Sequence, residues 1–504
     1  MARRLRILAA TVAGLAAAAG APAQAAIPPT PIPEGPGANQ LPQFIGSPAT
    51  PNPVFAPAIP QNPFMAQNGK SNVHDDAYMS DTYTWSGPLG RHMDRASTFQ
   101  AAECGTLTFD HAGRIVAICV GLEGPRLVMF DPQTLSLLAA FPLPPRQPGG
   151  GNPFTDFSGG GYFYLDDRDR AVIPTTTREI WIVRETTSPA GPGLVLDRAY
   201  DLNGTVAPDD KVISALPDWH GLIWFASTKG VVGTVNPDTG AVKSLNTGEA
   251  IGNSFATDES GGVYIVTDEK MYRFEAASDG SPQVSWSDVY PNTHEQKPGQ
   301  TEHGSGTTPT VMGSQYVSIT DNADPMDIVV YKRAKSITGS RVVCIQPVFQ
   351  QGASATDNSL IGTDTAMVVE NNYGYSGPGA TENGKTTTGG LERVDVDRAT
   401  GACHRVWHSD ERAPSVVPKL SLNNGLVYTY TKDPRSDGQD PWYLTALDFR
   451  SGRTVWKRIA GEGLGYNNNY APVTLGSNSY AYVGVLGGLV RLRDRGHGGG
   501  GGGD

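Results

Sequence analysis

The stretch TTPTVMGSQYVSIT (residues 307–320) decides the fold, because versions of it return along almost the whole chain. It opens with small polar residues, passes a short turn and closes in β-branched residues, a pattern typical of two strands joined by a hairpin. Four further copies are clear: SFATDESGGVYIVT (254–267), NSLIGTDTAMVVEN (358–371), SVVPKLSLNNGLVYTYT (415–431) and APVTLGSNSYAYVGV (471–485). Three are weaker: TLTFDHAGRIVAI (106–118), GYFYLDDRDRAVIP (161–174) and SALPDWHGLIWFAS (214–227).

The spacing of these copies predicts the architecture. Their equivalent points recur every 40 to 60 residues, which is the range expected of propeller blades. The points are Val116, Val172, Ile223, Val263, Val317, Met367, Val427 and Ala481. The 61 Gly and 39 Pro, with only 18% charged residues, also suit many short strands joined by turns. We therefore expect an all-β protein, an eight-bladed β-propeller with an extended Pro-rich N-terminal arm.

Composition divides the chain into five segments. Residues 1–25 have three Arg among the first six, then an Ala-rich apolar core and an Ala-Gln-Ala end, the layout of a secretory signal peptide. Residues 26–68 are dense in Pro and are predicted to be a disordered arm. Residues 69–102 form a cap over one end of the propeller or an edge segment, residues 103–494 form the propeller, and residues 495–504 are a Gly-rich tail. The protein is thus expected to be secreted, or periplasmic and associated with the cell envelope.

Charge and hydropathy narrow the expected partners. The net charge is −11, and no Lys/Arg cluster follows the signal segment, so we expect no nucleic-acid partner. No later run of about 20 apolar residues predicts a transmembrane segment. The expected partner is a small-molecule ligand or a cell-envelope protein, and the expected state is a monomer.

The four cysteines allow three disulfide pairings. Cys104 and Cys119 flank a predicted hairpin, and Cys344 and Cys403 lie in successive repeats, so these two pairings are predicted. A metal or haem site is the alternative, but the chain contains neither CxxC nor CxxCH.

Several repeats carry a second motif, a turn opened by Asp or Asn. The turns are DPQT (131–134), NPDTG (236–240), DRATG (397–401) and DFRSG (448–452). In the last copy the motif extends to ALDFRSGRTVW (446–456), which resembles the A-x-D-x-x-T-G-x-x-x-W repeat of the pyrroloquinoline-quinone-type propellers. Trp286 and Trp407 follow similar turns with altered spacing. The resemblance implies that these Trp side chains pack between blades.

The same resemblance does not imply that this chain binds the quinone cofactor. Quinone-dependent dehydrogenases of this fold place a vicinal Cys-Cys disulfide against the quinone, and this chain has no Cys-Cys pair. We therefore do not expect pyrroloquinoline quinone, and a quinone-dependent dehydrogenase is the lowest-ranked function.

Candidate site residues follow from ring geometry. The first strand of each blade lines the central channel, so polar residues at the ends of these strands meet although they lie about 50 residues apart. We expect catalytic acid/base roles for His303, Lys419 and Glu370. The expected substrate-binding residues are Thr308, Asp321, Asn322, Asp324, Asn358, Asn371, Asn372, Tyr373, Lys432, Asn468 and Asn469.

A calcium ion is the one cofactor candidate. The Asn and Asp pattern resembles that of the gluconolactonase, paraoxonase and strictosidine-synthase propellers, in which such side chains hold a central Ca²⁺. The resemblance implies Asn253, Asn358 and Glu370 as ligands, and calcium requires six to eight oxygens. Solvated turns are the alternative interpretation.

Two functions of different class fit the sequence. The first is binding of a small polar or sugar-like molecule at the channel mouth, with acid/base chemistry on it. The second is a non-catalytic scaffold of the cell envelope. Convergence of Asp321, Asp324, Glu370, Lys419 and Lys432 around one axis would favour the first.

Overall fold

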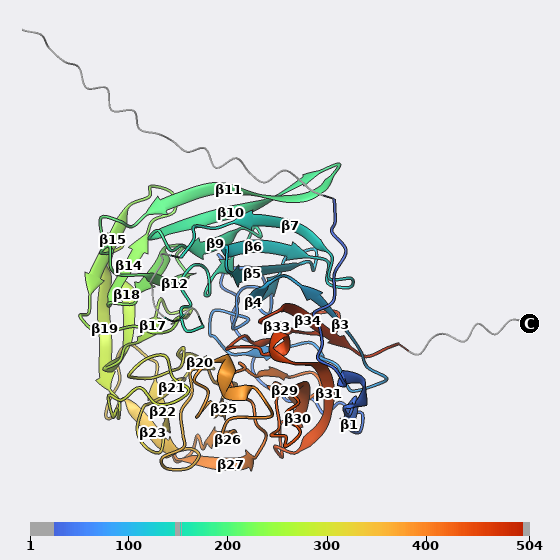
Figure 1. Ribbon diagram of the computed structural model, residues 1–504. Coiled ribbons are helices and arrows are strands. Elements are labelled where there is room, and N and C mark those ends of the chain that lie inside the picture. The colour runs from blue at the N-terminus through green and yellow to red at the C-terminus, as the bar shows by residue number, and fades with distance from the viewer. Residues whose placement is uncertain (1–24, 147–151, 153, 497–504) are drawn as a thin grey trace, which may run out of the picture.

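The computed structural model describes residues 25–146, 152 and 154–496. Within these ranges the strands form eight sheets arranged as a ring of blades, and each sheet has a core of four antiparallel strands (Figure 1). The predicted eight-bladed β-propeller is confirmed. The predicted signal peptide, apart from its last residue, and most of the Gly-rich tail lie outside the described residues.

The first four blades follow one another along the chain. Blade 1 contains β4 (Ala102–Phe109), β5 (Ile115–Gly121), β6 (Gly124–Phe130) and β7 (Leu137–Pro142). Blade 2 contains β8 (Tyr164–Leu165), β9 (Ala171–Pro174), β10 (Glu179–Ser188) and β11 (Gly191–Asp201). Blade 3 contains β12 (Val212–Pro217), β13 (Ile223–Ser227), β14 (Val231–Val235) and β15 (Val242–Asn246). Blade 4 contains β16 (Ala256–Thr257), β17 (Val263–Val266), β18 (Lys270–Ala276) and β19 (Pro282–Val289).

The remaining blades complete the ring. Blade 5 contains β20 (Thr310–Met312), β21 (Tyr316–Thr320), β22 (Asp327–Lys332) and β23 (Val342–Pro347). Blade 6 contains β24 (Ile361–Gly362), β25 (Ala366–Glu370), β26 (Leu391–Val396) and β27 (Cys403–Ser409). Blade 7 contains β28 (Lys419–Ser421), β29 (Leu426–Thr431), β30 (Pro441–Asp448) and β31 (Thr454–Glu462). Blade 8 contains β32 (Val473–Leu475), β33 (Ala481–Val485), β34 (Gly488–Arg493) and β3 (Asp94–Phe99).

Blades 7 and 8 take strands from the N-terminal part of the chain. β3 is the outermost strand of blade 8 and pairs with β34 from Asp94 opposite Arg493 to Phe99 opposite Gly488. β1 (Phe44–Gly46) adds to the outside of blade 7, and β2 (Thr82–Tyr83) adds to its inner edge. Three short 3₁₀ helices complete the described structure: η1 (Ala38–Gln40), η2 (Pro378–Thr381) and η3 (Leu464–Tyr466). The pairing of β3 with β34 joins the N-terminal part of the chain to the last blade and so closes the ring.

The repeat predicted from sequence corresponds to the first two strands of each blade. All eight equivalent points fall on β5, β9, β13, β17, β21, β25, β29 and β33. The turn motifs join the third and fourth strands, and their opening side chain accepts a backbone hydrogen bond as expected of Asx turns. For example, Thr134 N donates to Asp131 Oδ1 at 2.7 Å and Ser451 N donates to Asp448 Oδ1 at 2.8 Å.

The tryptophans of the repeat are buried. Trp456 is fully buried, and Trp407 and Trp286 are less than a tenth exposed. Trp407, on blade 6, donates its Nε1–H to the carbonyl oxygen of Phe449 on blade 7 at 2.8 Å, and the ring of Trp286, on blade 4, lies 6.1 Å from that of Tyr331 on blade 5. These two side chains pack between blades, whereas the ring of Trp456 lies 6.3 Å from that of Phe44 in β1.

Both predicted disulfides are present. Cys104–Cys119 joins β4 to β5 within blade 1, and Cys344–Cys403 joins the outer strands of blades 5 and 6. Since no described cysteine is free, the alternative of a cysteine metal site does not apply to them.

The Pro-rich arm differs from the prediction of disorder. Ile27 forms a β-bridge with Leu137, and β1 pairs with β31, so the described part of the arm follows the outside of the propeller. Ile32 and Leu41 are buried against it. The Pro residues favour extended chain, as predicted, and apolar residues between them give that chain a surface to bind.

Residues 66–85, here called the channel segment, run through the middle of the ring (Figure 1). In this segment the carbonyl oxygens of Ala77, Tyr78, Ser80 and Asp81 accept hydrogen bonds from the inner strands of blades 4, 5, 6 and 7 in turn. The donors are the N–H groups of Thr257, Val311, Gly362 and Leu420. The segment thus satisfies inner-strand edges that would otherwise face the channel unpaired. The sequence left two alternatives for residues 69–102, a cap over one end or an edge segment. The contacts of the channel segment with the inner strands agree with the edge segment.

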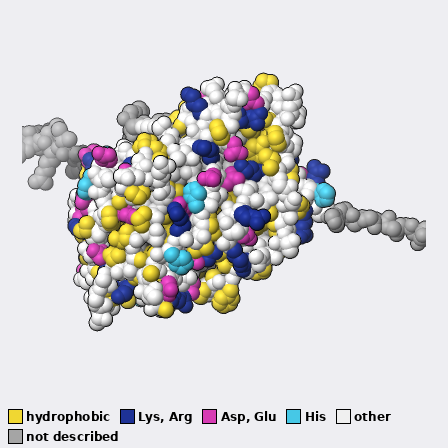
Figure 2. Space-filling model, turned by 90° about the horizontal axis from the view of Figure 1, so that it is seen from below, with side chains coloured by type: hydrophobic (Ala, Val, Ile, Leu, Met, Phe, Trp, Pro, Cys, Tyr) yellow, Lys and Arg dark blue, Asp and Glu magenta, His cyan; other side chains and the backbone are white. Residues whose placement is uncertain are grey.

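The outer surface carries charges of both signs. Figure 2 shows Lys and Arg interspersed with Asp and Glu on the face seen there. Among the described residues no helix is long and apolar enough to cross a bilayer.

Candidate functional site: a cavity at the front mouth of the channel

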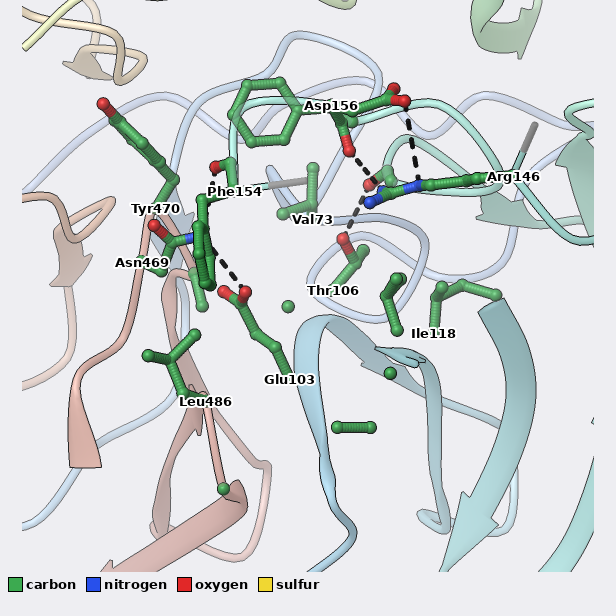
Figure 3. A pocket seen from close by; sticks show the side chains of 18 of the residues that line it. Val73, Glu103, Thr106, Ile118, Arg146, Phe154, Asp156, Asn469, Tyr470 and Leu486 are labelled. Carbon is green, nitrogen blue, oxygen red and sulfur yellow. Dashed lines mark hydrogen bonds and ion pairs between the residues drawn. The ribbon is translucent and has the colours of Figure 1, made fainter. Parts of the chain in front are cut away.

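A cavity of about 690 Å³ opens at the end of the channel where the inner strands begin, here called the front mouth. Its walls come from blade 1, from the connection between blades 1 and 2, from the residues that precede β24 and β32, and from the channel segment. In Figure 3, Glu103 and Asn469 point toward one another on one side, and Arg146 and Asp156 meet on another. This volume suits a small organic molecule.

Two carboxyl groups of this cavity, the partly buried Glu103 and the buried Asp357, have raised pKa values. Burial raises the pKa of Glu103 to about 8, although a hydrogen bond from Asn469 Nδ2 at 3.1 Å and the charge of Arg146 favour its ionised form. Burial likewise raises the pKa of Asp357 to about 7, and a hydrogen bond from Thr301 opposes the rise. Both groups therefore exchange a proton near neutral pH, as acid/base chemistry requires.

Asp357 also presents an oxygen without a partner. Its Oδ2 accepts a hydrogen bond from Thr301 Oγ1 at 2.7 Å, while its buried Oδ1 has no hydrogen-bond partner among the described residues. A buried polar atom left unpaired costs about 1–3 kcal/mol. Asp357 lines the cavity, but this oxygen has almost no accessible surface and faces the protein interior.

Aromatic rings form a row along the cavity wall. The ring of Tyr162 lies 6.3 Å from that of Phe157, which lies 5.7 Å from that of Tyr470. The imidazole of His74 lies 6.3 Å from Tyr162 and is stacked on it. Such rings offer flat apolar surfaces to a sugar or another ring.

At the bottom of the cavity the channel segment places a buried charged cluster. Lys419 Nζ donates to Asp81 Oδ1 at 2.5 Å, to Asp75 Oδ2 at 3.1 Å and to the carbonyl oxygen of Val73 at 2.5 Å. Burial raises the pKa of Asp75 well above its ordinary value, and Lys419 opposes that rise. His74 bridges the cluster to the cavity, since its Nδ1 lies 3.0 Å from Asp81 Oδ1 and His74 itself lines the cavity.

Some residues predicted from sequence do meet at the front mouth. Asn358 Nδ2 donates to Glu370 Oε1 at 3.0 Å, and Asn372 Nδ2 donates to the same oxygen at 2.6 Å. Burial raises the pKa of Glu370 well above its ordinary value, although Asn372, Asn358 and Thr429 donate to it. This network lies behind the cavity wall, to which only Asn358 of the three contributes. Glu370 therefore supports the wall and has no direct access to a ligand in the cavity.

Lys419, Thr308 and Asn469 were also predicted, and all three lie at the channel or cavity. Lys419 is in the buried cluster, and Asn469 pairs with Glu103. Thr308 is buried, with its Oγ1 3.1 Å from Ser254 Oγ and 3.5 Å from His74 Nε2. Lys419 is fully buried among its partners, so it acts on the cluster and does not reach the cavity.

The other predicted residues have separate surroundings. His303 and Asp324 are exposed, and neither lines the cavity. Asp321 accepts backbone hydrogen bonds from Ala323 and Asp327, and Lys432 contacts Asp440 at 2.9 Å. The remaining ones, which hold loops through hydrogen bonds or turns, are Asn322, Asn371, Tyr373 and Asn468. The five charged residues whose convergence would favour a ligand site thus do not converge.

The predicted calcium ligands do not form one set of oxygens. Asn253 accepts a hydrogen bond from the Tyr162 hydroxyl at 3.0 Å, whereas Asn358 turns its amide nitrogen toward Glu370. In the described part of the chain no group of three or more His, Cys, Asp or Glu side chains is arranged to hold a metal. Calcium stays a prediction without an assigned position.

Sequence reasoning missed Glu103, Arg146 and Asp156 as cavity residues. Glu103 lies near the start of the first inner strand. The criterion used for the other blades, a polar residue at the end of an inner strand, would therefore have selected it. Arg146 and Asp156 lie in a connection of no repeat character, and only the fold brings them to the channel.

Comparisons with known proteins assign no family and no function to the chain. No protein-family model matches the chain. An uncharacterized protein of Archaeoglobus fulgidus is 30% identical over 329 residues, which are 57% of this chain and 62% of that protein, so the match spans less than two thirds of the relative. The chain is also similar to the WD40 domain of SCAP from fission yeast, with 10% identity, a TM-score of 0.43, and coverage of 79% of this chain and 97% of that chain. Streptogramin B lyase is similar with 9% identity and a TM-score of 0.38, and the match covers 80% of this chain and 97% of that chain.

Proposed function

We propose that this protein binds a small polar or sugar-like molecule in the front-mouth cavity. The lining of the cavity carries the proposal, because a space of about 690 Å³ combines the carboxyl group of Glu103 with the aromatic row of Tyr162, Phe157 and Tyr470. Glu103 and Asn469 offer further polar contacts, and the aromatic row offers a flat apolar surface. This mixture of few polar groups on a largely apolar wall is typical of small-molecule sites.

The pKa values of the two carboxyls favour acid/base chemistry on the ligand. With values of about 7 for Asp357 and about 8 for Glu103, each group can donate or accept a proton near neutral pH. These residues replace His303 and Glu370 as the candidates for that role. Export to the cell envelope or outside the cell, proposed from the N-terminal segment, is consistent with the two disulfides.

Thermal melting tests the binding proposal. Glucose, galactose, arabinose and glucono-δ-lactone are each added to the purified chain, and a bound sugar raises the midpoint in proportion to the logarithm of its concentration over Kd. Gly105→Val is the cavity variant: Gly105 lines the cavity two residues after Glu103 on the same strand face, and a Cβ there contacts Glu103 atoms at 3.7 Å and beyond. The added methyl groups would then occupy ligand space.

The matched control is Gly204→Val, at an exposed turn where a Cβ meets nothing within 4 Å. We expect at least one sugar to raise the midpoint of the wild type and of Gly204→Val, and to raise that of Gly105→Val less. If none of the four sugars moves the wild-type midpoint, or if Gly105→Val responds as strongly as the wild type, the sugar-binding proposal is wrong.

A further inference from the structure

Three side chains from distant parts of the molecule meet between the cavity and the buried cluster. His74 Nε2 lies 3.3 Å from Ser359 Oγ, and His74 Nδ1 lies 3.0 Å and 3.2 Å from the two carboxylate oxygens of Asp81. His74 and Asp81 belong to the channel segment, and Ser359 precedes β24 of blade 6. All three are buried. A hydroxyl, an imidazole and a carboxylate joined in this order form the arrangement that activates a serine for nucleophilic attack.

The hydrogen bonds of Asp81 define which nitrogen of His74 carries the proton. Lys419 Nζ donates to Asp81 Oδ1 at 2.5 Å, and because an ammonium group only donates, this oxygen acts as an acceptor. The contact at 3.0 Å from the same oxygen to His74 Nδ1 is then made by an Nδ1–H donor. In the neutral imidazole Nε2 then carries the lone pair, 3.3 Å from Ser359 Oγ, as a general base requires.

Ser359 is the hydroxyl that a bound molecule can reach. Ser359 and His74 both line the cavity, and Asp81 lies behind them. Thr308 Oγ1 is the other hydroxyl near Nε2, at 3.5 Å, but it contacts Ser254 and does not line the cavity.

The residue before the serine is rigidly held. Asn358 Nδ2 donates to Glu370 Oε1, to Asn372 Oδ1 and to the carbonyl oxygen of Val416, at 2.9 to 3.1 Å. These contacts place Asn358, and with it the backbone that carries Ser359. The predicted Asn and Glu residues of the front mouth thus serve as positioning residues for the serine.

We propose that Ser359, His74 and Asp81 form a nucleophilic triad that hydrolyses carboxylic esters or lactones of small polar molecules; this rests on the proposed binding in the cavity. Ser359 Oγ attacks the carbonyl carbon, and its proton passes to His74 Nε2. The bond from the carbonyl carbon to the alcohol oxygen breaks, and the imidazolium gives its proton to that oxygen. Water then attacks the acyl carbon, loses a proton to Nε2 and displaces Ser359, which recovers the proton as the acid leaves. Asp81 stabilises the imidazolium, and Lys419 holds Asp81 in place.

Covalent labelling tests the triad directly. The full chain is treated with a fluorophosphonate probe, which forms a stable adduct with activated serines, and the labelled peptide is located by mass spectrometry. We expect the adduct on Ser359 in the wild type and in Thr308→Val, and its absence in Ser359→Ala. Hydrolysis of p-nitrophenyl acetate should fall about 1,000-fold or more in Ser359→Ala relative to the wild type. The midpoint of Ser359→Ala measures whether the variant is folded.

The sugar-dependent melting of the same variants separates the two proposals. If the wild type binds a sugar and carries no adduct on Ser359, the triad is wrong and the cavity proposal stands. If Ser359 is labelled and no sugar shifts the midpoint, the triad stands and the sugar-like ligand is wrong. Labelling of Thr308, or equal labelling of the wild type and Ser359→Ala, would also overturn the assignment.

Discussion

At the scale of single residues, Glu103 and Asp357 are carboxyl groups of the front mouth whose charge is costly to bury. Glu103 and Asp357 keep raised pKa values because the nearby donors compensate burial only in part. Such groups reduce stability when they ionise, so their presence at a cavity is better explained by a ligand than by folding. Because their pKa values differ between the folded and the unfolded protein, these two groups contribute to the pH dependence of the free energy of unfolding.

Glu103→Gln should remove part of the pH dependence of stability. The folded-state pKa of Glu103, about 8, lies above its ordinary value of 4.5, so the folded protein holds this proton where the unfolded chain has lost it. Its contribution to the free energy of unfolding is complete below about pH 4.5 and is lost as the pH rises toward about 8, at up to about 1.4 kcal/mol per pH unit. Melting midpoints measured across this range should fall less steeply for Glu103→Gln than for the wild type. Glu123→Gln, at an exposed hairpin tip, is the control, and equal slopes for all three proteins would refute the expectation.

At the scale of elements, the channel segment connects the fold to the candidate site. It satisfies the inner edges of several blades through its backbone, and the same residues place His74, Asp75 and Asp81 beside Lys419. Its charged side chains are buried because the backbone contacts hold them there. Residues 69–90 are too acidic and aromatic for a simple tether, but nothing local to them indicates the channel, since their hydrogen-bonding partners come from several blades.

Lys419→Met should destabilise the protein strongly. Removing the lysine leaves the carboxylate of Asp81 without its cation in a fully buried position, and breaking a buried pair in this way costs about 3–5 kcal/mol. The measurement is the melting midpoint and the denaturant midpoint of the variant. Lys229→Met is the matched control, because Lys229 pairs with Asp209 on the surface, where side chains are 54% and 76% exposed and such pairs contribute about 0–1 kcal/mol. If the two variants lose similar amounts of stability, the buried Lys419 ion pair contributes no more than a surface pair.

At the scale of the whole molecule, the ring was predictable and most of the site was not. Repeats of hairpin pattern and regular spacing are local signals, so residues such as Val317 and Val427 identified the second strand of each blade. The disulfides followed from their positions within and between repeats. The position of polar residues at the ends of inner strands also predicted Asn358 and Asn469, which lie just before such strands. The same argument was wrong for His303 and Asp324, because a polar residue in a loop can face solvent or the channel with the same local sequence. It also could not predict the contact between Ser359 and His74, which lie 285 residues apart.

The two disulfides should respond differently to reductant. Cys104 and Cys119 are fully buried, whereas Cys344 and Cys403 are partly exposed, so dithiothreitol should reduce the second pair first. Alkylation and peptide mapping of the reduced folded protein should find Cys344 and Cys403 modified and the other two intact. The Cys344–Cys403 bond closes a span of 59 residues, for which chain entropy predicts a contribution of about 4 kcal/mol. Given the large unfolding entropy of a chain of this size, that loss lowers the melting midpoint by about 4 °C.

The variant Cys344→Ala/Cys403→Ala gives the matched comparison. Wild-type protein in dithiothreitol should melt like the variant, and the variant should be insensitive to the reductant, because its buried Cys104–Cys119 bond stays closed. The Cys344–Cys403 bond ties together the outer strands of blades 5 and 6, where β23 and β27 otherwise meet without shared hydrogen bonds. If the variant melts at the wild-type temperature, the junction between these blades is held by packing alone, and the contribution assigned to the bond is wrong.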